Sequence, residues 1–189
     1  FIVSAHREEN VDQPNRLAAL MDALSALHEA YNLPVFVSVH PRTRARMEES
    51  GMSMTQDKGV HFMEPFGFLD YIKLQQHAFC VVSDSGTITE EAALLSFPAV
   101  TIRDAHERPE GMDSGTLLRV DCHAHAIKEA VDVAVKSQDR LGHQLGRVSD
   151  FEGGLVSDKV LRVVLSSIDI IRRKVWMKSS RDIVHKQTD

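Results

Sequence analysis

Short apolar runs alternate with longer stretches of helical periodicity along this 189-residue chain. Each run is rich in valine, isoleucine or phenylalanine and gives way first to polar residues and then to a helical pattern. The expected strands cover 1–4, 34–39, 60–62, 79–83, 98–103 and 115–120, and the expected helices cover 14–31, 42–49, 68–77, 87–96, 123–141 and 156–177. This alternation predicts right-handed βαβ units, hence an α/β fold with a Rossmann-like, doubly wound parallel sheet.

The composition narrows the class of protein and of partner. Hydrophobic residues make up 43% and charged residues 26% of the chain, which is ordinary for a globular domain. The net charge of −5 comes with no basic block, which disfavours nucleic acid and anionic membranes as partners. No apolar run approaches about 18 residues, and two cysteines are too few for a zinc site or a disulfide framework. We therefore expect a cytoplasmic protein without a metal.

The segment from Ser83 to Thr87 reads S-D-S-G-T and lies between a predicted strand and a predicted helix. A serine–glycine turn that opens a helix presents backbone amides and the positive helix end, which together favour phosphate. Glu91 follows inside the same helix, where a carboxylate can accept hydrogen bonds from sugar hydroxyls. Arg108 follows the next strand and can supply the fixed positive charge that a diphosphate needs. These residues favour a nucleotide or nucleotide-sugar site.

Other polar residues also follow predicted strands, and ligands bind at the carboxyl ends of the strands in such sheets. His6 stands in a polar loop after the first strand, where a ligand role is favoured over helix capping. For His40 a ligand role and a structural role are equally supported. Glu64 opens a turn into a helix whose backbone could hydrogen-bond a flat base, with Tyr71 on that helix. For the aromatic rings of the turn, core packing is the stronger alternative.

These motifs together resemble the second half of a non-hydrolysing UDP-N-acetylglucosamine 2-epimerase. The matching pieces are S-A-H-R-E-E-N, V-H-P-R, E-P-F-G-F-L-D-Y, S-D-S-G-T-I-T-E-E-A and I-R-D-A-H-E-R-P-E-G-M-D-S-G-T. They occur in family order over roughly the first two thirds of the chain. The H-R-E-E-N and H-P-R-T variants are most similar to the branch that acts on UDP-N-acetyl-L-fucosamine precursors in capsule and O-antigen synthesis.

The resemblance implies a fold, a set of roles and a reaction. It implies the C-terminal, UDP-binding half of a two-domain GT-B architecture, in an isomerase that inverts C2 of the sugar by eliminating UDP and adding it back, without a cofactor. It assigns diphosphate to Ser85, Gly86 and Thr87, although the family usually has a second glycine where this chain has Thr87. It assigns uracil to the backbone of Tyr71. The remaining assignments are ribose to Glu91, phosphate or sugar to His6 and Arg108, and substrate to His40 and Glu64.

The same reasoning divides the chain and leaves alternative functions open. We expect a UDP-binding domain over residues 1–155, a helix over 156–178 that packs partly on a missing N-terminal domain, and a tail over 179–189. Because the first residues already read as a strand, we expect a piece of a longer, homodimeric protein that binds UDP weakly alone and does not turn over. The alternatives are the donor domain of a GT-B glycosyltransferase, a hydrolysing epimerase and a non-catalytic UDP-sugar-binding module.

Overall fold

The computed structural model describes residues 1–51, 59–104, 108–141 and 148–177. These residues belong to two compact units, Phe1–Phe151 and Glu152–Asp189, each of which is described by itself. The expected tail over 179–189 lies outside the described residues.

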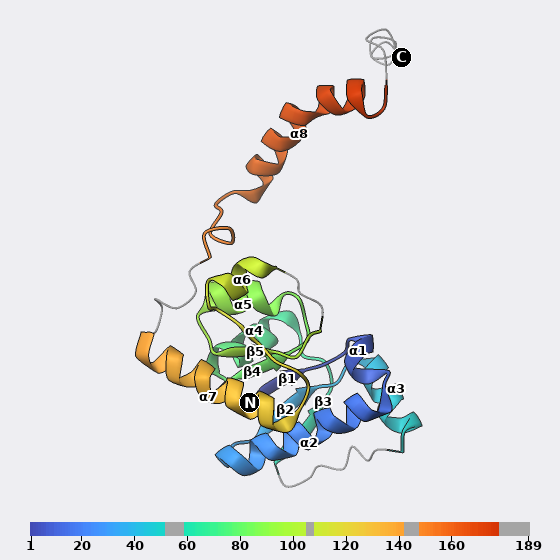
Figure 1. The fold of residues 1–189 in the computed structure, drawn as a ribbon, viewed down its shortest axis with the longest axis vertical. Helices are drawn as coiled ribbons and strands as arrows, with labels where there is room; N and C mark the ends of the chain where they lie inside the picture. The colour runs from blue at the N-terminus through green and yellow to red at the C-terminus, as the bar shows by residue number, and fades with distance from the viewer. Residues whose placement is uncertain (52–58, 105–107, 142–147, 178–189) are drawn as a thin grey trace. The chain divides into compact units, whose positions relative to one another are not determined.

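A six-stranded, fully parallel sheet forms the centre of the first unit, which confirms the predicted α/β fold (Figure 1). Its strands lie in the order β3-β2-β1-β4-β5-β6. They are β1 (Ile2–Ser4), β2 (Val35–Ser38), β3 (Val60–Met63), β4 (Val81–Ser83), β5 (Ala99–Thr101) and β6 (Leu118–Arg119). The direction of winding reverses between β1 and β4, so the carboxyl ends of these two strands border the crevice in which such sheets bind ligands.

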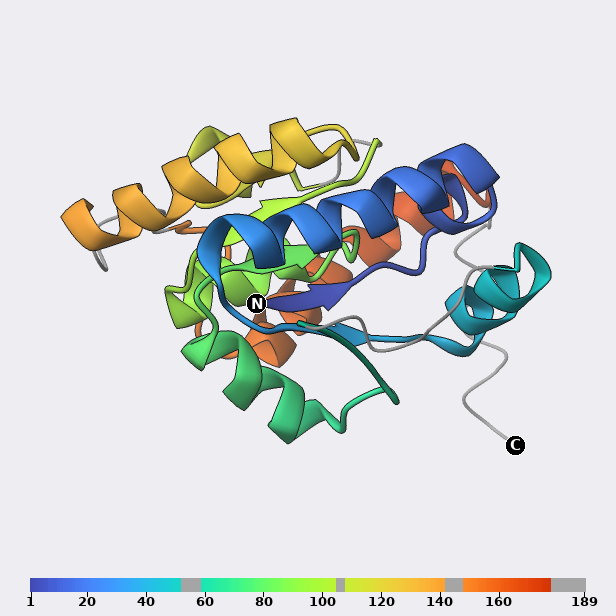
Figure 2. The same ribbon diagram turned by 90° about the horizontal axis from the view of Figure 1, so that it is seen from below.

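Helices cover both faces of this sheet. In the first unit they are α1 (Glu8–Val11), α2 (Pro14–Tyr31), α3 (Pro41–Glu49), α4 (Phe68–His77), α5 (Ile88–Leu95), α6 (Pro109–Asp113) and α7 (Ala124–Leu141). Figure 2 shows α2 and α7 side by side on one face and α4 on the other. The helices over 14–31 and 68–77 have the bounds that the sequence predicts. The one-turn helices α1 and α6 were not predicted, because four or five residues carry no helical period.

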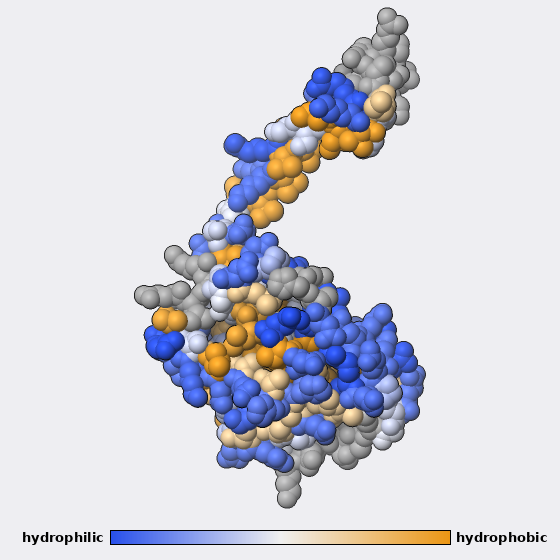
Figure 3. All heavy atoms as spheres, viewed as in Figure 1, coloured by the Kyte–Doolittle hydropathy of each residue, from blue (hydrophilic) through white to orange (hydrophobic). Residues whose placement is uncertain are grey.

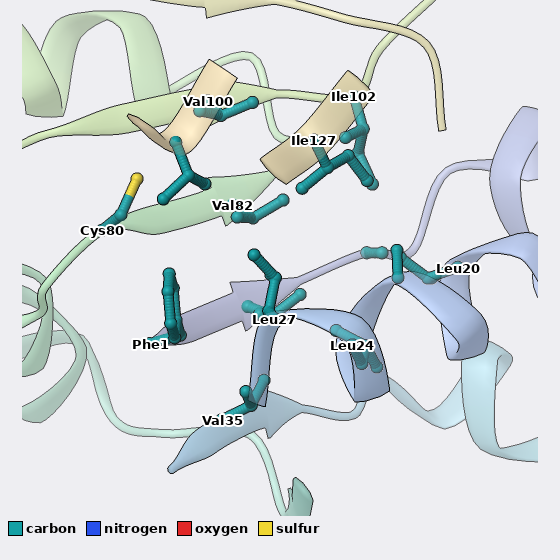
Figure 4. Close-up of a cluster of buried hydrophobic side chains, with 14 of the residues drawn as sticks. Phe1, Leu20, Leu24, Leu27, Val35, Cys80, Val82, Val100, Ile102 and Ile127 are labelled. Atoms are coloured by element: carbon teal, nitrogen blue, oxygen red, sulfur yellow. The ribbon is translucent and has the colours of Figure 1, made fainter. Parts of the chain in front are cut away.

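The hydrophobic core has a layer on each face of the sheet. The stripe of α2, which includes Leu20, Leu24 and Leu27, packs on alternate residues of the central strands such as Val82 (Figure 4). The opposite layer joins Val81 to the inward side chains of α5, chiefly Ile88. Burial of large aliphatic side chains on both faces fixes the strands, and with them the polar residues at the strand ends.

The second unit contains α8 (Val156–Lys174), in which no residue is buried. Apolar side chains such as Leu161, Val164 and Leu165 are exposed along it. Figure 3 shows that hydrophobic residues cover much of the visible surface of this helix. The predicted helix over 156–177 is therefore present, ending three residues earlier. Among the described residues, no helix is long and apolar enough to cross a membrane.

Candidate nucleotide site

The carboxyl ends of β1 and β4 lie side by side, with Ser4 opposite Ser83. Asp84 follows β4 and is completely buried. Its carboxylate accepts hydrogen bonds from the backbone amides of His6 and Arg7, at 3.0 and 2.9 Å, and from Nδ2 of Asn10 at 3.1 Å. These donors compensate the burial of the charge and fix the loop after β1 against the turn after β4. Sequence reasoning gave Asp84 no role of its own, although a carboxylate directly after an apolar strand is a signal for one.

His6 lies at this junction, as the strand pattern predicted. Its Nδ1 is 3.3 Å from Oδ1 of Asp84, and its side chain retains 35% of its accessible surface. A carboxylate beside Nδ1 orients an imidazole, and the other ring nitrogen then serves a ligand. The ring centroid of His40 is 5.7 Å from that of His6, so the two predicted histidines share one edge of the sheet. His40 also has the structural role that was its alternative, because its Nδ1 accepts the amide of Arg42 at the start of α3.

The turn between β4 and α5 differs in one detail from the expected phosphate cradle. The backbone amide of Ser85 donates to Oγ of Ser83 at 3.0 Å, so this amide is already engaged. No described side chain caps the first turn of α5. Within the described ranges, the amides of Gly86 and Thr87 have no hydrogen-bond acceptor. The turn can therefore offer an anion these two amides and one hydroxyl proton, because the hydroxyls of Ser85 and Thr87 lie 3.0 Å apart and one donates to the other.

Arg108 reaches the same helix from the segment after β5. Its Nε donates to Oε1 of Glu90 at 2.8 Å, and both side chains are about one third exposed. Arg108 has a φ of 54°, a backbone conformation that is uncommon for a residue other than glycine. The structure thus brings the predicted cation to the first turn of α5, where its Glu90 partner offsets part of its charge.

Glu91 is held by a contact that sequence reasoning missed. Oε2 of Glu91 accepts a hydrogen bond from Nε2 of Gln75 on α4, at 2.6 Å. Tyr71 lies on the same helix as Gln75, one turn before it. Burial, and next the nearby charge of Glu91, raise the pKa of Tyr71 to about 12. Tyr71, Gln75 and Glu91 therefore form one polar cluster between α4 and α5.

The turn from β3 into α4 contains the last predicted residues. Glu64 is exposed and pairs with Arg44, at 2.6 Å. The rings of Phe66 and Tyr71 stack, with centroids 6.4 Å apart and planes at 15°. The amide of Tyr71 donates to the carbonyl of Gly67 at 2.9 Å, so this part of its backbone is engaged within the helix. The amides of the residues just before Tyr71 have no acceptor within the helix. These are therefore the amides in the first turn of α4 that can donate to a ligand.

The predicted residues consequently line one edge of the sheet, but they do not form one compact cluster. Three strand spacings separate β3 from β4 in the strand order, which corresponds to about 14 Å. Glu64 at the end of β3 and Ser85 after β4 therefore mark the two ends of an extended site, with His6 and His40 between them.

Comparison with known proteins places this arrangement in a family. The UDP-N-acetylglucosamine 2-epimerase family profile matches residues 1–165. A UDP-N-acetylglucosamine 2-epimerase from Methanocaldococcus jannaschii is 28% identical over 166 residues, which are 87% of this chain and 44% of the relative. The solved structure of the Rickettsia bellii UDP-N-acetylglucosamine 2-epimerase is 44% identical and has a TM-score of 0.78, covering 94% of this chain and 47% of that one.

A second solved structure bears on the ligand. The Methanocaldococcus jannaschii UDP-GlcNAc 2-epimerase, in complex with UDP-GlcNAc and UDP, is 28% identical with a TM-score of 0.78, and the match covers 88% of this chain and 45% of that one. The chain thus spans slightly less than half the length of the relatives that it matches. With a family profile that covers the whole sheet and solved relatives that share its fold, this chain belongs to the UDP-N-acetylglucosamine 2-epimerase family.

Proposed function

We propose that this chain is the UDP-binding half of a non-hydrolysing epimerase that inverts C2 of a UDP-N-acetylhexosamine. The observation that carries the proposal is the junction of β1 and β4, where buried Asp84 holds the His6 loop against an uncapped helix start. Family membership supports it, as does the complex of a solved relative with UDP-GlcNAc and UDP.

The diphosphate binds at the turn between β4 and α5. The amides of Gly86 and Thr87 and the hydroxyl of Ser85 supply neutral donors, and the positive end of α5 favours the anion. Arg108 supplies the positive charge, since its guanidinium already contacts Glu90 in the first turn of that helix. His6 lies at the adjoining loop and donates to a phosphate or sugar oxygen.

The nucleoside extends from this turn toward β3. Glu91 accepts hydrogen bonds from the ribose hydroxyls, and the backbone at the start of α4, up to Tyr71, holds the uracil. His40 and Glu64 line the same edge and complete the substrate site. The roughly 14 Å between the two ends of the site suits an extended nucleotide.

The proposed reaction breaks the bond between C1 of the sugar and UDP, removes the proton at C2, and then returns both with the opposite configuration at C2. UDP leaves as an anion, so fixed donors and Arg108 stabilise the charge that develops on it. His6 and Arg108 are thus the catalytic residues of this half. The base for the C2 proton lies in the other half of the protein, so this chain alone does not turn over.

The exposed apolar face of α8 fits the same proposal. We assign the UDP-binding domain to residues 1–155 and propose that the segment 156–178, which contains α8, packs partly on the N-terminal half. The exposed side chains of Leu161, Val164 and Leu165 support this proposal, because an apolar helix face is normally covered by another surface. The complete protein is then a cytoplasmic homodimer.

Calorimetric titration with UDP tests the site. Arg108→Ala and Glu91→Ala should each weaken UDP binding about ten-fold, the loss expected for one hydrogen bond to a charged group. Arg140→Ala and Glu129→Ala, which remove the same side chains from exposed positions on α7, are the matched controls and should bind like the parent chain. Unchanged affinity in the Arg108 and Glu91 variants would place UDP elsewhere.

The reaction is tested after the complementary half is restored. Incubation with UDP-N-acetylglucosamine, followed by NMR, should give the C2 epimer still attached to UDP. Free N-acetylmannosamine would identify a hydrolysing epimerase, and transfer to an added acceptor would identify a glycosyltransferase. Binding without any product would identify a non-catalytic module.

A further inference from the structure

Gln75 is the one residue of α4 that is buried, and its side chain is completely inaccessible to solvent. A buried primary amide destabilises a fold unless its donors and its acceptor all find partners. In the part of the chain that the structure describes, Nε2 of Gln75 is bonded but the buried Oε1 has no hydrogen-bond partner. For the fold alone, an apolar side chain of similar size would be the less costly choice at this position.

The orientation of this amide is set by Glu91. Nε2 lies 2.6 Å from Oε2 of Glu91, so the reversed orientation of the amide would bring two acceptor oxygens together. Oε1 of Glu91 accepts no hydrogen bond from the described residues. Gln75 therefore engages one carboxylate oxygen of Glu91 and leaves the other for a ligand.

Tyr71 supports the same geometry from the neighbouring turn of α4. Burial, and next the charge of Glu91, raise the pKa of its hydroxyl, so Tyr71 lies in the same polar cluster as Gln75 and Glu91. The complete burial of Gln75 holds its amide in place. A charge-assisted hydrogen bond from such a fixed donor restricts Glu91 to one rotamer before any ligand arrives.

We propose that Gln75 is a positioning residue that fixes the Glu91 carboxylate for the ribose hydroxyls and so sets the preference of this site for ribonucleotides over deoxyribonucleotides. The inference rests on the proposed function, since it takes Glu91 as the ribose ligand. Gln75 does not touch the nucleotide itself. Its effect reaches the ligand only through Glu91.

The test compares UDP with 2′-deoxy-UDP, titrated calorimetrically into the 189-residue chain. Gln75→Met should reduce the preference for UDP about five-fold, the effect of one net hydrogen bond, while affinity for 2′-deoxy-UDP stays within about two-fold. Gln76→Met, the same change at the exposed neighbouring position, should keep the full preference. Adding Gln75→Met to Glu91→Ala should cause no further loss, since both act on one contact.

Thermal unfolding separates this role from a structural one. Gln75→Met removes the hydrogen bond to Glu91 but also an amide with an unpaired buried oxygen. Because these two effects oppose each other, the melting temperature should change little even as the ribose preference falls. If Gln75→Met unfolds the chain, Gln75→Leu serves instead, because it also removes the donor without placing a charge at this buried position. Unfolding of both variants would make Gln75 a folding residue and overturn the proposal.

The remaining outcomes distinguish this proposal from the one on which it rests. If Glu91→Ala loses the preference and Gln75→Met keeps it, Glu91 binds ribose but Gln75 does not position it. If Gln75→Met weakens both nucleotides equally, its role is structural and the proposal fails. If the parent chain shows no preference, or Glu91→Ala keeps it, the ribose assignment fails and the role of Gln75 fails with it.

Discussion

Replacing Asp84 by alanine should destabilise the first unit by about 3 kcal/mol, and the contacts of its carboxylate set this figure. The change removes the acceptor for the amides of His6 and Arg7, and a buried donor left without a partner costs about 1–3 kcal/mol. Asn10 loses less, because its Nδ2 also donates to the carbonyl of Ile102 at 3.2 Å. The two amides are only partly buried and can recover some hydration, so the lower half of the range applies.

Urea unfolding followed by circular dichroism measures this loss, with the slope against urea unchanged. The same loss of about 3 kcal/mol should lower the melting temperature by about 10 °C in a domain of this size. Asp22→Ala, on the exposed side of α2, is the matched control and should change stability by less than about 0.5 kcal/mol. Asp84→Asn should fall between the two, because its amide keeps one oxygen acceptor. A loss below about 1 kcal/mol for Asp84→Ala would refute the role of the carboxylate as the tie between β1 and β4.

Three further predictions concern titration, thiol reactivity and packing. Burial raises the pKa values of Tyr31 and Tyr71, the latter from 10.0 to about 12, so the folded chain should resist tyrosinate absorbance at 295 nm until well above pH 10. Unfolded tyrosine ionises first, so stability should fall as the pH rises from about 10 to about 12; a native titration near pH 10 would contradict this. Burial also raises the pKa of Cys80 to about 12, and both cysteines are free and buried. The thiol reagent 5,5′-dithiobis(2-nitrobenzoate) should therefore label them only when the chain unfolds. Rapid labelling of the native chain would contradict this, because it would show an accessible thiol. A Cβ at Gly111 would lie 2.0 Å from Cγ2 of Thr89, so Gly111→Ala should lower the free energy of unfolding in urea by about 1–3 kcal/mol. Thr89→Ser removes that methyl group and should restore the stability of Gly111→Ala. Equal losses for Gly111→Ala with and without Thr89→Ser would rule out the clash.

Much of the fold and of the candidate site was predictable because its determinants are local. The period of the apolar residues distinguishes strands from helices, and Pro14 at the first turn of α2 and left-handed Asn32 after it mark the ends of that helix in the sequence. Since parallel strands expose their carboxyl ends at one edge, polar residues such as His6 and Ser85 could be placed at that edge without coordinates.

The sequence by itself therefore determined the fold class and the edge of the sheet that carries the site, whereas the tertiary structure decided which side chains meet there. Asp84 accepts a hydrogen bond from the amide of His6, although 78 positions separate them in the sequence. Gln75 on α4 donates a hydrogen bond to Glu91 on α5. Such contacts depend on the order of the strands and on the distance between α4 and α5. Neither of these produces a repeating pattern of residues in the sequence. The physical reason is that a repeating pattern reports only which face of an element is buried, while a hydrogen bond requires two atoms within about 3 Å, which only the packed sheet and helices provide.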